Sequence, residues 1–222
     1  MKLKNYNDAF FKYLNSGSSK SAELIIPLIL DQLSIQSVLD VGCGQGAWLS
    51  IWKKYGVKNI FGIDGNYVNN LLIDEQYFLP HNLDNAFDLE SKFDLVQCLE
   101  VVEHLPKDKS RIIIESLIRH GDVVLFSAAT KGQGGDNHIN EQSYEYWRSI
   151  FSDYEYVPID FIRPIISNIN GIEPWYSYNI ILYVSADYLC NLPQSIKDCI
   201  VPEGQKINDI SPIWYRARKL LI

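Results

Sequence analysis

The chain has 222 residues, of which 47% are hydrophobic and 21% carry a charged side chain, and its formal net charge at pH 7 is −7. This length and apolar content are sufficient for a single domain with a sizeable core. The acidic balance disfavours a long nucleic-acid contact, which requires clustered Lys and Arg, and favours a small-molecule substrate.

Location and redox state can be predicted from the same composition. No apolar run approaches the roughly 20 residues that span a bilayer, and the opening MKLKNYNDAFFKY is too polar for a signal peptide. The cysteines, Cys43, Cys98, Cys190 and Cys199, show no C-x-x-C spacing, which indicates reduced thiols. We expect a cytoplasmic protein without a membrane partner, whose oligomeric state the sequence leaves open.

The first part of the chain reads as a helix followed by alternating strands and helices. SAELIIPLILDQL (21–33) is typical of an apolar helix, with Pro27 as a kink or a boundary. Four β-rich runs follow: SVLDV (37–41), NIFGID (59–64), FDLVQCL (93–99) and DVVLFSA (122–128). A weaker strand is expected before Asn82. This alternation predicts βαβ units and a parallel sheet covered on both faces.

The second part begins with a polar loop. KGQGGDNHIN (131–140) contains three glycines and is typical of a functional loop. EQSYEYWRSIF (141–151) predicts a helix and WYSYNIILYV (175–184) a late strand. WYRARKLLI (214–222) predicts a short basic amphipathic helix with a solvated RARK face.

A glycine-rich turn follows the first strand. VLDVGCGQGAW places Gly42, Gly44 and Gly46 between a strand and a helix, where glycine lets the backbone approach a ligand closely. The glycines alone also fit a dinucleotide fingerprint, or simple tight turning. Asp40 favours S-adenosylmethionine, because its carboxylate would repel a pyrophosphate and attract an ammonium and a sulfonium. Asp64 closes the second strand, where a carboxylate can accept both ribose hydroxyl protons.

In this order, VLDVGCGQG, FGIDG, FDLVQCLEVVEHL and LFSA resemble the motifs of class I S-adenosylmethionine-dependent methyltransferases over nearly half the chain. The resemblance implies an α/β, Rossmann-like, doubly wound sheet of seven strands, mostly parallel with the last strand antiparallel, and helices on both faces. It implies one methyltransferase domain with an N-terminal helical cap (1–36), a cofactor-binding half (37–130) and a substrate-side half (131–222).

The resemblance also implies S-adenosyl-L-methionine as cofactor, S-adenosyl-L-homocysteine as product, and an adenine framed by Asn82 and Leu83. Asn82 departs from the family, which often has Asp there. The expected cofactor contacts are Asp40, Gly42, Cys43, Gly44, Gly46, Asp64, Gly65, Asn82, Leu83 and Leu99.

LEVVEHL (99–105) puts Glu100, Glu103 and His104 at i, i+3 and i+4, so on a helix these side chains would share one face. The stretch follows the fourth strand, at the sheet edge where open α/β folds bind ligands. One hypothesis is a metal site. In the other, Glu100 contacts the cofactor or caps the helix, Glu103 is solvated, and His104 is a general base.

Two methyltransferase subfamilies with the full E-x-x-E-H string, small-RNA 2′-O-methyltransferases and ubiquinone-pathway O-methyltransferases, hold a divalent cation through it. The RNA group adds a histidine in a pattern similar to D-H-x-x-E-W, and GGDNHINEQSYEYW offers His138 in that setting with different intervening residues. The resemblance therefore implies metal ligation by Glu100, Glu103, His104 and His138, with Glu103, His104 and His138 as catalytic residues. This ligand set suits Mn²⁺, Fe²⁺, Co²⁺ or Zn²⁺ better than Mg²⁺.

The acceptor is less well defined by the sequence. Asp136 is expected to orient an imidazole or bind substrate, and His138 could also be a loop histidine without a partner. In this fold the substrate cleft is flanked by the region of Arg163, Trp175, Tyr176, Tyr178 and Asn179. A cation with aromatic walls suits a phosphorylated or sugar-like ligand, although such aromatic clusters also form cores.

Three functions are therefore considered. The first is an O-methyltransferase acting on a small hydroxylated or phosphorylated metabolite, sugar- or nucleotide-linked, in surface-polysaccharide assembly; that context rests on resemblance to small stand-alone bacterial enzymes. The second is an RNA 3′-end 2′-O-methyltransferase, which the acidic balance disfavours. The third is a non-catalytic interaction module that keeps the cofactor fold, against which the intact Asp40, glycines and Asp64 argue.

Overall fold

The computed structural model describes residues 8–207, in which strands and helices alternate along most of the chain. The strands are β1 (Ser37–Val41), β2 (Asn59–Asp64), β3 (Phe78–Pro80), β4 (Leu95–Leu99), β5 (Val123–Ser127), β6 (Tyr156–Ile159) and β7 (Ile181–Ser185). The α-helices are α1 (Asp8–Leu30), α2 (Ala47–Lys54), α3 (Ser110–His120), α4 (Tyr144–Ser152), α5 (Ile162–Ile166), α6 (Pro174–Asn179) and α7 (Gln194–Lys197). Short 3-10 helices are η1 (Glu75–Tyr77), η2 (Val102–His104), η3 (Lys107–Lys109) and η4 (Ala186–Asn191).

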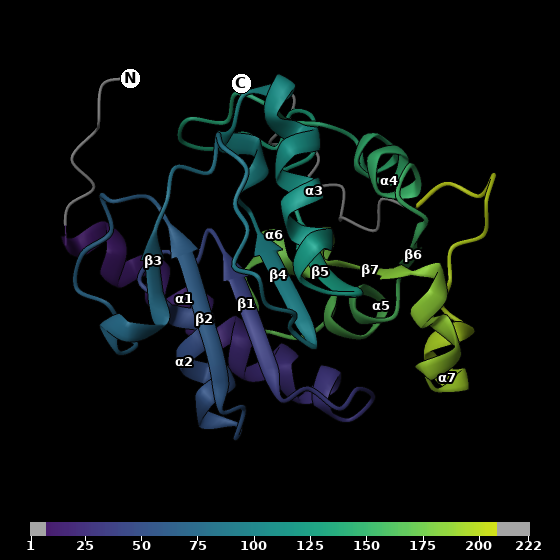
Figure 1. Cartoon of the computed structure of the whole chain (residues 1–222), viewed down its shortest axis with the longest axis horizontal. Coiled ribbons are helices and arrows are strands. Elements are labelled where there is room, and N and C mark those ends of the chain that lie inside the picture. Colours follow the sequence, from purple (N-terminus) through teal and green to yellow (C-terminus); the bar gives the residue numbers. More distant parts are fainter. Residues whose placement is uncertain (1–7, 208–222) are drawn as a thin grey trace.

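The strands form one seven-stranded sheet in the order β3-β2-β1-β4-β5-β7-β6 (Figure 1). All neighbouring pairs are parallel except those of β7, which runs antiparallel to both β5 and β6. The expected doubly wound sheet of seven strands, with the last strand antiparallel, is confirmed.

Two apolar layers pack on opposite faces of this sheet, because successive strand residues point to opposite sides. Val38 and Leu125 join the core formed with α1 and α2, whereas Leu39 and Phe126 join the core formed with α3 and α4. Helix α3 packs against β4 and β5 on the sheet face that carries Leu39 and Phe126 (Figure 1). Burial on both faces explains why the central strands are almost continuously apolar.

The parallel strands place their carboxyl ends along one edge of the sheet. Gly42 follows β1, Asp64 ends β2, Glu100 follows β4 and Ala128 follows β5. The chain reverses its winding between the adjacent strands β1 and β4, which is the position where open α/β sheets bind ligands. Between residues 8 and 207, no helix combines the length and the apolar character needed to cross a bilayer.

Two expected elements differ in the structure. Residues 99–105 are not a helix: Leu99 ends β4, Glu100 adopts a left-handed φ of 56°, and only Val102–His104 form a 3-10 turn. The β-branched pair Val101 and Val102 is poorly suited to a helix, and the turn redirects the chain at the sheet edge. The expected strand over 175–184 begins as helix α6, with Pro174 at its first turn, and only β7 is extended.

Two expected helices are present but have different ends. Helix α1 begins well before residue 21 and continues past Pro27 for one turn, ending at Leu30. Helix α4 begins at Tyr144 rather than at 141, because the Ser143 side chain accepts a hydrogen bond from the Tyr146 N–H and caps it. The helix expected over 214–222 lies outside the described residues.

Candidate active site

The glycine turn joins β1 to α2, and each of its glycines has a positive φ. Gly42 (φ 81°) donates its N–H to the Ile63 carbonyl at 2.7 Å, and a Cβ there would lie 2.3 Å from Val101. Gly44 (φ 53°) faces open space, since no described atom lies within 4 Å of the position of a Cβ. The turn is therefore packed closely against Val101 at Gly42 and leaves open space for a ligand at Gly44.

Asp64 ties this turn to the end of β2. Its Oδ2 accepts the Gly44 N–H at 2.7 Å, and its Oδ1 accepts the Gly65 N–H at 2.6 Å and the Tyr67 hydroxyl at 2.7 Å. Burial raises the pKa of this carboxyl. Tyr67 thus presents to Asp64 the kind of O–H donor that a ribose would offer.

Asp40 lies on β1 beside Gln97 of β4, its register partner, and Gln97 Nε2 has no hydrogen-bond partner among the described residues. The Trp52 indole N–H donates to Gln97 Oε1 at 2.7 Å and fixes that amide. Burial, and secondarily the charge of Asp64, raises the pKa of Asp40 to about 8. A buried carboxyl of this kind favours a ligand that brings a positive charge.

The remaining predicted cofactor residues line the same strand ends. Cys43 and Leu99 are buried, and the Cys43 thiol donates to the Gly44 carbonyl. Leu83 is buried in the turn after β3, whereas Asn82 is exposed and its Oδ1 accepts the Asp84 N–H. All four therefore lie in segments that end at the ligand edge.

Glu100 follows β4 and lies against residues from two other segments. Its N–H donates to the Ser127 carbonyl at 3.0 Å, and its carboxylate accepts from Asn179 Nδ2 at 3.1 Å and Gln133 Nε2 at 3.3 Å. Burial raises the pKa of Glu100 to about 7. The charge of Glu100 also acts on the buried Glu103 carboxyl, so the two acids titrate as a pair.

Glu103 is completely buried on η2. Its Oε1 accepts the Ala129 N–H at 3.3 Å, while its Oε2 has no hydrogen-bond partner among the described residues. Burial, and then the charge of Glu100, raises the pKa of Glu103. A buried, unpartnered carboxylate oxygen is unfavourable unless another donor or a cation reaches it.

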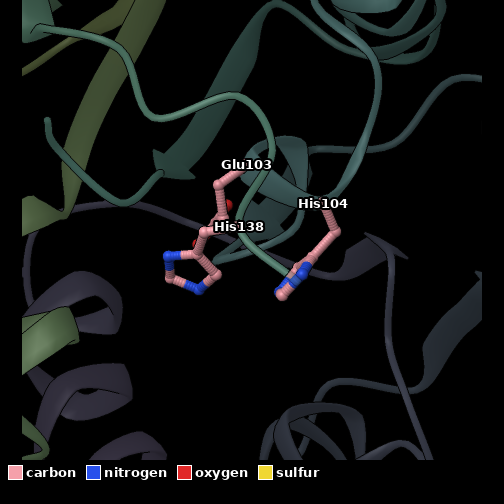
Figure 2. A group of neighbouring side chains, drawn as sticks. All are labelled: Glu103, His104 and His138. Carbon is pink, nitrogen blue, oxygen red and sulfur yellow. The ribbon is translucent and has the colours of Figure 1, made fainter. Parts of the chain in front are cut away.

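Glu103, His104 and His138 converge, and their candidate ligand atoms lie within 4.8 Å of one another (Figure 2). The two imidazole rings meet edge to face with centroids 4.9 Å apart. Burial, and then the charge of His138, lowers the pKa of His104. Two imidazoles beside an unpartnered carboxylate oxygen offer the mixed nitrogen and oxygen ligands that fit a divalent cation.

Glu100 lies outside this group, although the sequence predicted it as a fourth ligand. With its left-handed backbone at the end of β4, Glu100 is not one helical turn from Glu103, and Asn179 and Gln133 occupy its carboxylate. The structure therefore brings together three of the four predicted ligands.

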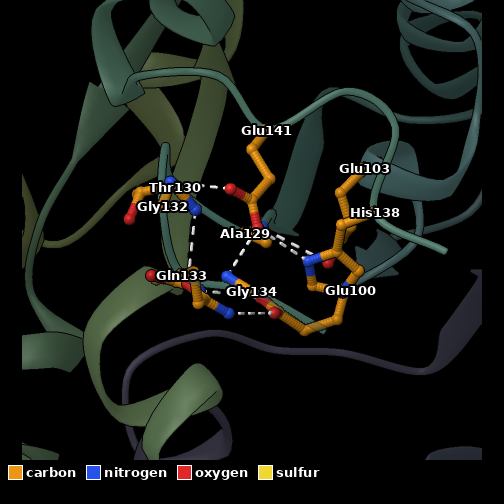
Figure 3. Close-up of polar contacts among 10 residues, drawn as sticks. Glu100, Glu103, Ala129, Thr130, Gly132, Gln133, Gly134, His138 and Glu141 are labelled. Atoms are coloured by element: carbon orange, nitrogen blue, oxygen red, sulfur yellow. Dashed lines mark hydrogen bonds and ion pairs between the residues drawn. The ribbon is translucent and has the colours of Figure 1, made fainter. Parts of the chain in front are cut away.

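The loop after β5 carries His138 into the site (Figure 3). His138 Nδ1 lies 3.0 Å from Glu141 Oε1, and the Glu141 carboxylate also accepts the Gly132 and Gly134 N–H groups. Asp136, the residue predicted to orient an imidazole, is exposed. Glu141 was missed, although its H-x-x-E spacing to His138 was visible in the sequence.

The predicted substrate residues divide into two groups. Arg163 is fully buried, forms an ion pair with Asp160 and donates to the Tyr178 carbonyl at 3.0 Å, so it packs the fold instead of facing a substrate. Tyr176 is also buried and packs edge to face on Trp48, with Trp175 beside it. Of this region, Asn179 reaches the site, through its bond to Glu100.

Comparison with known proteins adds independent findings. A family model described as a methyltransferase domain matches residues 7–160. The ubiquinone biosynthesis O-methyltransferase of Neisseria meningitidis serogroup C (strain 053442) is 30% identical over 142 residues, covering 56% of this chain and 59% of that protein. The chain thus spans less than two thirds of the length of this relative.

Solved structures share the fold. Magnesium protoporphyrin IX methyltransferase from Synechocystis PCC 6803, with bound S-adenosylhomocysteine, superimposes with a TM-score of 0.55 at 19% identity, covering 82% of this chain and 90% of that chain. DesVI of Streptomyces venezuelae gives a TM-score of 0.60 at 12% identity, covering 84% of this chain and 100% of that chain.

Proposed function

We propose, because the chain belongs to the methyltransferase-domain family, that it transfers the methyl group of S-adenosylmethionine to an oxygen atom of a small hydroxylated or phosphorylated metabolite. The observation that carries the proposal is the position of two groups along one sheet edge. Asp40, the glycine turn and Asp64 form a cofactor side, and Glu103, His104 and His138 form an acid and imidazole side.

The cofactor side suits the charges of S-adenosylmethionine. Its ammonium and sulfonium compensate the buried Asp40 carboxylate, and its ribose hydroxyls can take the place of the Tyr67 hydroxyl on Asp64. Gly44 leaves the space that a close ligand requires.

The acid and imidazole side suits an oxygen acceptor, because an unperturbed alcohol is a poor nucleophile at neutral pH. Glu103, His104 and His138 would hold a divalent cation, which would bind the acceptor hydroxyl and lower its pKa. In the transfer, the methyl carbon forms a bond to oxygen as its bond to sulfur breaks. The hydroxyl proton passes to a base that does not hold the cation, and S-adenosylhomocysteine leaves with a neutral thioether sulfur.

The acceptor class is supported from two directions. A relative named for O-methylation in ubiquinone biosynthesis supports a hydroxyl acceptor. The net charge of −7 supports a small molecule, and we propose a sugar- or nucleotide-linked acceptor of surface-polysaccharide assembly as the first class to test.

The proposal is tested by product analysis with and without metal. The protein is incubated with methyl-¹³C-labelled S-adenosylmethionine and panels of sugar nucleotides, sugar phosphates and catechols, and the product is identified by NMR. We expect an O-methyl signal that disappears in excess EDTA and returns with Mn²⁺, Co²⁺ or Zn²⁺. An N-methyl or C-methyl product would contradict oxygen transfer, and full activity in EDTA without bound metal would contradict the metal site.

An RNA 3′-end 2′-hydroxyl is the second candidate, favoured by the convergence of His138 on the E-x-x-E-H segment. Filter binding of short RNAs at several salt concentrations separates the two candidates. Tight, salt-dependent binding with methylation of the terminal ribose would replace the small-molecule proposal.

A further inference from the structure

We propose that Glu141 is a positioning residue of this site: its carboxylate holds His138 in the tautomer that carries its proton on Nδ1, which leaves the Nε2 lone pair for a metal. The inference concerns a hydrogen bond within the chain, and its consequence for metal binding rests on the proposed function. Glu141 does not itself belong to the converging group of Glu103, His104 and His138.

Three N–H donors converge on the Glu141 carboxylate. Gly132 donates to Oε2 at 2.6 Å, Gly134 donates to Oε1 at 2.7 Å, and His138 Nδ1 lies 3.0 Å from Oε1 (Figure 3). An ionised carboxylate can only accept hydrogen bonds, so the imidazole must place its proton on Nδ1. The ring nitrogen left with a lone pair in the neutral tautomer is Nε2.

His138 and Glu141 are sufficiently shielded from solvent for their hydrogen bond to determine the tautomer of His138. The side chains of His138 and Glu141 are only 13% and 17% exposed. At such burial, a charge-assisted hydrogen bond is screened much less than one at the surface.

The residues between His138 and Glu141 are attached to the ligand cluster itself. The N–H groups of Ile139 and Asn140 both donate to the Glu103 carbonyl, at 2.9 and 3.0 Å. The buried Asn140 side chain also donates to the Val102 carbonyl and the Ser110 hydroxyl at 3.2 Å. Two of the three converging residues, Glu103 and His138, are therefore fixed relative to each other through the segment that Glu141 ends.

Replacing Glu141 with Gln tests the inference. An amide offers one acceptor atom and one NH₂ donor, so its NH₂ must face either the Gly132 N–H or the Gly134 and His138 side. At least one of the three bonds is lost, and His138 Nδ1–H keeps an acceptor only where the amide oxygen faces it, so the Nδ1 tautomer is no longer imposed. Glu203→Gln, the same change at an exposed position of a distant turn, is the matched control.

Two readouts are measured. In metal-free, ¹⁵N-histidine-labelled protein, the nitrogen chemical shifts of His138 report the tautomer directly. We expect a protonated Nδ1 in the wild type and in E203Q, and a mixed or reversed tautomer in E141Q. Calorimetric affinity for Mn²⁺ or Zn²⁺ is expected to fall about tenfold or more in E141Q, as is typical when an outer-shell carboxylate is lost, with S-adenosylhomocysteine affinity unchanged.

The outcomes separate this inference from the proposed function. If the wild type binds no divalent metal but shows the Nδ1 tautomer that E141Q abolishes, the metal proposal fails and the positioning role of Glu141 stands. If wild-type His138 carries its proton on Nε2, the inference is overturned even where E141Q fails to fold. It is also overturned if E141Q retains both the wild-type tautomer and the wild-type metal affinity.

Discussion

Asp40 is a buried acid without a cationic partner among the described residues, and this makes cofactor binding depend on pH. Because burial raises its pKa to about 8, Asp40 is mostly protonated at pH 7 in the free protein. A ligand that brings an ammonium and a sulfonium stabilises the ionised form, so binding releases a proton. Asp64, whose pKa is also raised by burial, acts in the same direction.

The affinity for S-adenosylmethionine should therefore increase as the pH rises from about 6.5 to 8, by up to about tenfold per pH unit. Calorimetry in buffers of different ionisation enthalpy would measure both the dissociation constant and the proton release. Asp40→Asn should bind more weakly and lose most of the dependence. A wild-type affinity that is constant over this range would contradict the role given to Asp40.

Asp64 holds the glycine turn, and the proposed cofactor site also gives it the ribose hydroxyls to bind. Asp64→Ala removes the acceptor of the Gly44 and Gly65 N–H groups and of the ribose hydroxyls. Since each charge-assisted hydrogen bond contributes roughly 1.5–3 kcal/mol, cofactor affinity should fall at least tenfold. Equilibrium dialysis on protein with a native circular dichroism spectrum would check this. Wild-type affinity in a folded D64A protein would exclude Asp64 from the cofactor site.

The loop from Lys131 to Glu141 is the element that completes the acid and imidazole side, and Gly135 leaves room for its histidine. Gly135 has a φ of 151°, and a Cβ there would lie 2.3 Å from His138 Nε2. Even one methyl group at this position must displace the imidazole ring.

Gly135→Ala should therefore weaken divalent-metal binding at least about tenfold, as expected for loss of one properly placed ligand, and should leave S-adenosylhomocysteine binding within twofold. Gly204→Ala is the matched control, because Gly204 also has a positive φ (81°) but no described atom within 4 Å of its Cβ position. Calorimetric titration of both variants with Zn²⁺ gives the comparison. Equal metal affinity in the two variants would show that the ring can move without loss.

Elements with strong local patterns were predictable from the sequence, and those set by tertiary context were not. The predicted strand SVLDV has the same first and last residues as β1, because a strand buried on both faces is almost continuously hydrophobic and easily recognised. Strand β6 was not predicted, because Pro158 interrupts its pattern and is tolerated only because β6 is an edge strand. The E-x-x-E-H spacing identified Glu103 and His104 but implied a helix, and nothing in the spacing indicated the left-handed Glu100.

For the whole molecule, the accumulation of buried acids at one edge opposes folding when no ligand is bound. Asp40 and Glu100 have pKa values raised to about 8 and about 7, and the pKa values of Asp64 and Glu103 are also raised. The pKa values of these carboxyl groups are higher in the folded than in the unfolded protein. Their contribution to the free energy of unfolding is therefore fully present below about pH 4 and is lost as the pH rises through 7 and 8.

Between about pH 6.5 and 8, the ligand-free protein should lose about 1–2 kcal/mol of unfolding free energy, which lowers Tm by several degrees for a chain of this size. His104 and His120, whose pKa values burial lowers, act in the opposite direction: in the unfolded chain they are still partly protonated near pH 6.5, so together they add back less than about 1 kcal/mol as the pH rises to 8. Differential scanning calorimetry in EDTA, with and without S-adenosylmethionine, would measure the effect. Cofactor should reduce the loss, and a Tm that rises with pH in its absence would contradict this account.

The cofactor side and the acid and imidazole side are separate along the sheet edge, so protein engineering could change one without changing the other. Strands β1 and β2 carry the cofactor side, whereas the acid and imidazole side comes from the turn after β4 and the loop after β5. Loops of other polarity that keep a histidine and a glutamate at the positions of His138 and Glu141 could therefore replace residues 131–141 while Asp40, the glycine turn and Asp64 stay unchanged. Such grafts would turn one chain into a set of catalysts that share a methyl donor and differ in what they modify.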